Sequence, residues 1–270
     1  MAKTSSSTAA ETPWDGGISM KNNGFLTYEK PVLTCMVQAD NPGRVKELID
    51  LSLPEGAEAF GMQFCRMKEE YRNADVYREL FAYAGDKPVY VTNYRQGVNE
   101  GKSDAQLGEE LIEMAACGAA LCDVMGDYFD KCEGELTMDE EAVKKQMELI
   151  NAIHAKGAAV IMSSHVLKYT PAERVLEIAR EHQRRGADIC KIVTGAEDMA
   201  QQVENLRIVD LLKKELDIPF LYLAGGECRI LRRIGASMGS CMSLCVHEYD
   251  ALATPTQPLL RDMKLIRDLI

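Results

Sequence analysis

The sequence predicts a single (β/α)8 barrel, and three observations support this. Short apolar runs alternate with helical patterns eight times, no linker interrupts the alternation, and the runs are nearly continuous in their apolar character. Nearly continuous apolar strands that are joined through helices form parallel sheets. Eight such repeats in a chain of 270 residues fit a closed barrel better than an open doubly wound sheet. We therefore expect one domain over residues 17–270 and a flexible Ser-, Thr- and Ala-rich tail over residues 1–16.

The expected elements follow from periodicity and from helix-end signals. The first expected element is a β-hairpin over residues 18–28, with Asn23-Gly24 as its turn. We expect this hairpin to cap the base of the barrel. Thr137 is the expected N-cap of the fourth helix, and Pro171 is expected at the first position of the fifth. The expected strands cover residues 31–38, 57–64, 88–94, 119–125, 158–164, 187–194, 218–224 and 241–247, and the expected helices cover 43–53, 73–84, 104–116, 138–155, 171–185, 199–216, 227–238 and 258–270.

Composition limits the classes of function. The chain has 31 Lys and Arg against 42 Asp and Glu, a formal net charge of −11, and no block of basic residues. Such a chain repels phosphate backbones, so nucleic-acid binding is not expected. The longest apolar stretches are strand-sized, so no membrane span is expected either. Nine cysteines, several of them inside apolar strands, are typical of small buried side chains in a reducing compartment, so we expect a cytoplasmic protein without a zinc site.

A lysine in the sixth expected strand is the first candidate for chemistry. Lys191 lies within an apolar run over residues 186–193, and period-two alternation places it on the same face as Ile189 and Val193. Lysine is seldom buried without a partner, and desolvation favours the neutral, nucleophilic amine that attacks a carbonyl to form a Schiff base. The alternative is that Lys191 lies at the strand end and reaches solvent along its aliphatic stem.

A histidine on the neighbouring strand strengthens this hypothesis. In a (β/α)8 barrel the chemistry lies at the carboxyl ends of the strands, and His165 stands at the end of the fifth strand. An imidazole beside an imine-forming lysine can move protons during imine formation, proton abstraction and departure of a leaving group. His154 and His182 lie on expected helices, where a histidine more often satisfies a local hydrogen bond. Asp123 also lies at a strand end, that of the fourth strand.

Two segments resemble motifs of a known family. Residues 160–165, running on to Thr170-Pro171, and residues 186–192 are similar to the strand-five histidine motif and the strand-six lysine motif of the type I 3-dehydroquinate dehydratase family. The resemblance extends from Met20 to Ile270. It implies that Lys191 forms an imine with a ring ketone, that His165 is the proton shuttle and that water leaves from the neighbouring carbon. It also implies that no metal or organic cofactor is needed.

The resemblance implies further site residues. Arg232 matches the arginine that holds the substrate carboxylate, and Gln257 matches the glutamine of the lid loop. Glu100 matches the glutamate that orients the histidine, provided that its loop is about two residues longer than in the family. At the end of strand three, either Tyr94 replaces the family arginine or Arg95 serves after a local insertion.

The chain also departs from the family pattern. Gly61-Met62-Gln63 stands where the family has a triplet similar to Glu-Trp-Arg, and Ala253 replaces the serine of the lid. Gln63 can hydrogen-bond a neutral hydroxyl or carbonyl where an arginine would prefer an anion. Methionines at strand ends either line an apolar pocket or fill gaps in the core: Met62, Met125 and Met162.

Three functions are compatible with these residues. The first is a 3-dehydroquinate dehydratase or a relative that acts on a similar cyclic hydroxy-keto acid. The second is a class I aldolase-like lyase on another keto compound, although Gly225-Gly226 has no Gly-rich counterpart after strand eight to complete a phosphate cradle. The third is a non-catalytic binding relative, which would more naturally have lost Lys191 or His165. A homodimer or homotetramer through the outer helices is compatible with all three.

Overall fold

The computed structural model describes residues 23–27, 29–227 and 229–269, so the expected tail over residues 1–16 lies outside the described part. The strands are β1 (Val32–Val37), β2 (Ala59–Gln63), β3 (Val89–Thr92), β4 (Leu121–Met125), β5 (Ala159–His165), β6 (Ile189–Gly195), β7 (Phe220–Gly225) and β8 (Met242–Cys245). The α-helices are α1 (Pro42–Ser52), α2 (Ala74–Tyr83), α3 (Asp104–Cys117), α4 (Glu140–His154), α5 (Ala172–Arg184), α6 (Met199–Glu215), α7 (Leu231–Met238) and α8 (Leu260–Leu269), and the 3-10 turns are η1 (Phe64–Arg66), η2 (Glu69–Tyr71) and η3 (Gly97–Asn99).

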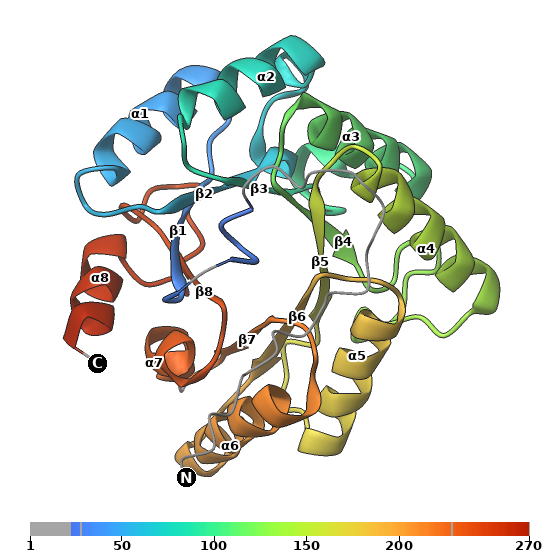
Figure 1. The fold of residues 1–270 in the computed structure, drawn as a ribbon, viewed down its shortest axis with the longest axis vertical. Coiled ribbons are helices and arrows are strands. Elements are labelled where there is room, and N and C mark those ends of the chain that lie inside the picture. The colour runs from blue at the N-terminus through green and yellow to red at the C-terminus, as the bar shows by residue number, and fades with distance from the viewer. Residues whose placement is uncertain (1–22, 28, 228, 270) are drawn as a thin grey trace, which may run out of the picture.

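The strands form one parallel sheet that curves into a barrel. Their order is β7-β6-β5-β4-β3-β2-β1-β8, so consecutive strands from β1 to β7 pair with one another and β1 also pairs with β8. The backbone N–H of Cys241 donates to the carbonyl of Phe220 at 2.8 Å, which brings the starts of β8 and β7 together. Figure 1 shows the helices on the outside of the strands. The predicted (β/α)8 barrel is confirmed.

The predicted helices are present, but some of their ends differ. Thr137 is not the N-cap of α4: Asp139 is, because its side chain accepts from the backbone N–H of Ala142, while the Thr137 hydroxyl accepts from the N–H of Asp139 at 3.0 Å. Pro171 is the N-cap of α5 rather than its first helical residue. Helix α7 begins later than expected, at Leu231, after a turn in which Gly226 has a φ of +84° that does not belong to a right-handed helix.

The predicted N-terminal hairpin is not supported. Its first expected strand lies outside the described residues, and residues 23–27 form turns and bends rather than the second strand. Within this turn Phe25 is fully buried and packs edge-on against Tyr90, with 6.5 Å between the ring centroids. The turn therefore closes the base of the barrel. Burial of the Phe25 side chain stabilises the fold by about 1.5 to 3 kcal/mol.

Side chains along each strand alternate between the barrel interior and the helix layer. In β6, Ile189 and Val193 belong to the interior hydrophobic cluster, whereas Cys190 and Ile192 pack in the cluster that includes residues of α5 and α6. Lys191 lies between the two inward residues. It therefore points into the barrel, on the face that the alternation predicts.

Within the described ranges, no helix is both long and apolar enough to cross a membrane. The cysteines described there all carry unpaired thiols. No group of three His, Cys, Asp or Glu side chains in the same ranges is arranged to hold a metal ion.

Candidate active site

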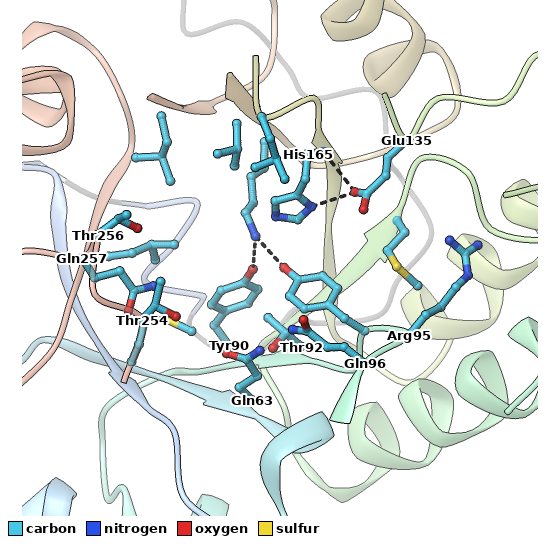
Figure 2. Close-up of a pocket in the computed structure, with 18 of the residues that line it drawn as sticks. Gln63, Tyr90, Thr92, Arg95, Gln96, Glu135, His165, Thr254, Thr256 and Gln257 are labelled. Atoms are coloured by element: carbon cyan, nitrogen blue, oxygen red, sulfur yellow. Dashed lines mark hydrogen bonds and ion pairs between the residues drawn. The ribbon is translucent and has the colours of Figure 1, made fainter. Parts of the chain in front are cut away.

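A cavity of about 460 Å³ opens at the carboxyl ends of the strands. This is the end of a (β/α)8 barrel where active sites lie. Figure 2 shows side chains from several strands and from the loop after β8 pointing into it. The structure brings together all but one of the predicted site residues, and those that line the cavity are Gln63, Tyr94, Arg95, His165, Lys191, Arg232 and Gln257.

Lys191 is held at the bottom of this cavity. Its residue is only 4% exposed, so the stem does not carry the amine out to solvent. The Nζ atom donates to Asp123 Oδ2 at 2.9 Å, to the Tyr94 hydroxyl at 2.6 Å and to the Tyr90 hydroxyl at 3.1 Å. A buried amine with three oxygen partners has a fixed position in the site.

Asp123 is the partner that the sequence reasoning left without a role. Its Oδ2 atom also accepts from the hydroxyls of Tyr90 and Tyr94, and its Oδ1 atom accepts from the Ser163 hydroxyl. Burial raises the pKa of Asp123, but the charges of Lys191 and His165 and the donated hydrogen bonds lower it more, so the pKa lies below its ordinary value. Asp123 is thus a carboxylate, and it stabilises a positive charge at Lys191.

The two tyrosines remain neutral hydrogen-bond donors. Burial, followed by the charge of Asp123, raises the pKa of Tyr90 and that of Tyr94 well above 10. The Tyr94 ring also meets the His165 ring edge-on, with 5.3 Å between centroids. Tyr94 therefore stands between the lysine and the histidine.

The hydrogen-bond partners of Arg95 distinguish it from Tyr94. Its guanidinium makes a bidentate contact with Asp104, at 2.6 and 2.8 Å, and its Nη1 atom donates to Asp127 at 2.7 Å. Arg95 borders the cavity, but both carboxylates neutralise it. Tyr94 is the side chain that contacts Lys191.

His165 is oriented by Glu135 and not by Glu100. Its Nδ1 atom lies 2.7 Å from Glu135 Oε2, which also accepts from the His165 backbone N–H at 3.0 Å. Glu100 is exposed, so the role implied for it is a wrong prediction. The physical reason is that Asn99 occupies the inside of that loop: it is buried, and its amide donates to Asn93 Oδ1 and to the Tyr94 carbonyl, both at 2.8 Å.

Glu135 lies on the loop between β4 and α4 and has a φ of +49°. Its carbonyl accepts from the Ser164 hydroxyl at 2.6 Å, and that hydroxyl lies 3.0 Å from Nε2 of His182. The other ring nitrogen of His182 lies 3.4 Å from Cys190 Sγ. Burial, and then the charge of Arg185, lower the pKa of His182 to about 3, so the ring is neutral, with Nε2–H donating to Ser164 and Nδ1 accepting from the thiol. This buried chain holds the left-handed turn at Glu135 in place.

Gln63 faces the cavity and is linked through Gln38 to the loop after β8. Its Oε1 atom accepts from Gln38 Nε2 at 2.9 Å, and the same Gln38 nitrogen donates to Thr254 Oγ1 at 2.9 Å. Neutral groups from β2, from the end of β1 and from the loop after β8 are therefore joined. Of the strand-end methionines, Met125 lines the cavity, whereas Met62 and Met162 belong to a core cluster shared with the helices.

Arg232 and Gln257 offer unused polar atoms to a bound molecule. The only partner of the Arg232 side chain within the described residues is the Ala224 carbonyl, which accepts from Nε at 3.0 Å. Burial, and then repulsion by Arg229, lower the pKa of Arg232 to about 10, so it is a cation at neutral pH. Gln257 is buried, and its Oε1 atom has no hydrogen-bond partner in the described part of the chain.

The fold and the site together define a class: a (β/α)8-barrel enzyme whose cavity is built around a buried lysine and a glutamate-bound histidine. Comparisons with known proteins give the family. The family model described as type I 3-dehydroquinase matches residues 67–270. The chain therefore belongs to the type I 3-dehydroquinase family, whose members are hydro-lyases.

Individual relatives agree with this assignment. The 3-dehydroquinate dehydratase of Alkaliphilus oremlandii is 30% identical over 135 residues, which are 49% of this chain and 51% of that protein. The match thus spans about half the length of that relative. The enzyme of the same name from Syntrophotalea carbinolica is 26% identical over 211 residues, 76% of this chain and 78% of that protein.

Solved structures share the fold. The 3-dehydroquinate dehydratase of Geobacillus kaustophilus superposes with a TM-score of 0.76 at 16% identity, covering 89% of this chain and 91% of that one. The type I enzyme of Clostridium difficile gives a TM-score of 0.74 at 18% identity, covering 90% and 94%. At these identities the likeness establishes the barrel architecture.

Proposed function

We propose that this chain removes water from a cyclic hydroxy-keto carboxylic acid of the 3-dehydroquinate type, through an imine on Lys191. The observation that carries the proposal is the buried amine at the bottom of the cavity, with His165 on the adjacent strand. The register of β5 and β6 pairs His165 with Val193, next to Lys191 on the inward face. The imine withdraws electrons from the neighbouring carbon, so the reaction uses no metal or organic cofactor.

Asp123 would act as the counterion of this chemistry. In the resting site it stabilises the ammonium form of Lys191, so the amine must give up a proton before it attacks the ketone. The protonated imine that forms afterwards restores a positive charge at the same place, 2.9 Å from the carboxylate in the resting geometry. Charge is therefore conserved beside Asp123, and the neutral phenols of Tyr90 and Tyr94 add hydrogen bonds without adding charge.

His165 would carry the proton through the elimination. Because Glu135 accepts the hydrogen bond from Nδ1, the Nε2 lone pair of the neutral ring is left to act as a base. It removes a proton from the carbon next to the imine, and the electron pair of that C–H bond moves into the imine. When the electrons return, the C–O bond to the hydroxyl on the next carbon breaks. His165 gives its proton to the leaving hydroxyl, so water departs and the ring keeps a double bond.

Glu135 and Glu100 give a matched pair of variants. We expect Glu135→Gln to lower kcat by about tenfold to a hundredfold, because it keeps a hydrogen-bond acceptor but loses the charge that stabilises the protonated imidazole. Glu100→Gln should leave kcat unchanged. Steady-state kinetics of both variants test this expectation. A larger loss in the Glu100 variant would contradict the observed pairing.

Arg232 would bind the substrate carboxylate through a charge-assisted, planar contact. We expect Arg232→Gln to raise KM by about tenfold to a hundredfold with a smaller effect on kcat, since the contact acts mainly in binding. Arg229→Gln, at an exposed arginine that donates to the Gly226 carbonyl, is the control. An unchanged KM for the Arg232 variant would place the carboxylate elsewhere.

The reaction type can be tested by incubating the protein with 3-dehydroquinate and following the ultraviolet absorbance of the conjugated product. An enone carboxylate that retains every ring carbon supports the elimination. Cleavage of a carbon–carbon bond into two smaller carbonyl compounds would instead indicate an aldolase. Product analysis by mass spectrometry separates the two results.

A further inference from the structure

The strand side chains that line the cavity fall into two arcs of the barrel, below the polar side chains that α7 and the loop after β8 contribute. Strands β6, β7, β8 and β1, which follow one another around the barrel, contribute four apolar side chains that we call the apolar arc: Val193, Leu223, Leu244 and Met36. All four belong to the interior hydrophobic cluster of the barrel. The side chains from β2 to β6 that line the same cavity are mostly polar and include Gln63, Thr92, His165 and Lys191.

At the β1 end of the apolar arc, the side chain of Met36 packs over Gly61 of β2. A Cβ atom added to Gly61 would lie 2.2 Å from Met36 Sδ, 2.8 Å from Met36 Cε and 3.2 Å from Tyr90 Cδ1. The Met36 thioether therefore fills the space that a side chain at position 61 would take. A thioether donates no hydrogen bond and accepts only weakly, so this part of the wall offers almost nothing to a hydroxyl group.

The apolar arc selects against a substrate hydroxyl group, because it offers that group no hydrogen-bond partner. A substrate hydroxyl that is pressed against the apolar arc loses its hydrogen bonds to water and gains none. A C–H edge in the same place loses nothing and buries apolar surface. Specificity between a hydroxylated ring and its deoxy counterpart through such contacts is about tenfold to a hundredfold.

We propose that the site is specific for a cyclic keto carboxylic acid whose ring edge against the apolar arc carries hydrogen only, a less hydroxylated ring than that of 3-dehydroquinate. This inference rests on the proposed imine chemistry at Lys191. The polar atoms that remain unused are consistent with it: the Thr92 hydroxyl and Gln257 Oε1 have no partner in the described residues, and together with Arg232 they suffice for a carboxylate and one hydroxyl.

The test compares 3-dehydroquinate with its 4-deoxy and 5-deoxy analogues on the full chain. We expect kcat/KM for one of the two analogues to exceed that for 3-dehydroquinate by at least about tenfold, with a borohydride-stable adduct on Lys191 for the preferred compound. A kcat/KM for 3-dehydroquinate that equals or exceeds both others would overturn the specificity inference and leave the imine proposal intact. If none of the three compounds gave an adduct on Lys191, the proposed function would fail as well.

Two variants of Met36 locate the discrimination. Met36→Gln places an amide in the wall at similar volume. We expect it to lower the ratio of kcat/KM for the preferred deoxy analogue to kcat/KM for 3-dehydroquinate by about tenfold. Met36→Leu keeps the wall apolar and should keep the wild-type ratio. The ratio compares two substrates on one protein preparation, so a partly unfolded sample does not change it. An unchanged ratio in the Gln variant would overturn the assignment to this wall.

Discussion

Replacement of Lys191 by Met should abolish imine formation and lower turnover by about 10⁴-fold or more. The side chain of Met matches the length of the buried stem but has no nucleophile, and the other lysine that lines the cavity, Lys131, is exposed. Mass spectrometry after borohydride reduction and steady-state kinetics measure the two effects. Normal turnover in this variant would contradict the assignment of Lys191 as the imine-forming nucleophile.

The same substitution has a second consequence, because it leaves a carboxylate buried without its cation. Breaking a buried ion pair from one side costs about 3 to 5 kcal/mol in free energy of unfolding. The double variant Lys191→Met, Asp123→Asn should recover most of this loss, since no unpaired charge remains. Urea denaturation of both variants measures the stability. Catalysis should stay absent in the double variant, which separates the chemical role of Lys191 from its part in the fold.

Replacement of His165 by Ala has the second largest expected effect. Turnover should fall by about 10²- to 10⁴-fold, the usual contribution of a general acid–base group. The imine should still form, because Lys191 keeps Asp123 and both tyrosines, so borohydride should trap a substrate-sized adduct. Glu100→Gln, on the loop after β3, serves as the matched variant. Wild-type turnover, or the loss of every adduct in a folded His165 variant, would contradict the assignment of the proton shuttle.

The barrel could be predicted from the sequence because its signals are local. Apolar runs, helix ends and the alternation of side chains in β6 each depend on a few neighbouring residues, and Lys191 points inward as that alternation predicts. The N-terminal segment, where a hairpin was expected, could not be predicted from such local signals. The Asn23-Gly24 pair does mark a turn, but the burial of Phe25 against Tyr90 depends on residues far along the chain.

The parts of the site that the sequence missed are contacts between segments that lie apart in the chain. Spacing along one loop favoured Glu100, whereas Glu135 reaches His165 from another loop, and the buried chain through Ser164 contributes to its position. Asp123 gave a usable signal, since an acid within the apolar run of β4 requires a cation at the same level of the barrel. The fit of Met36 against Gly61 gave none, because the two residues meet only across neighbouring strands.

The central claim is an imine on Lys191, and borohydride trapping tests it most directly. The wild-type protein is incubated with 3-dehydroquinate or its deoxy analogues, reduced, digested and analysed by peptide mass. We predict one stable adduct, on the peptide that contains Lys191, and none in the Lys191→Met variant. An adduct confined to another lysine, or a complete absence of adducts while the compound is still turned over, would contradict the account.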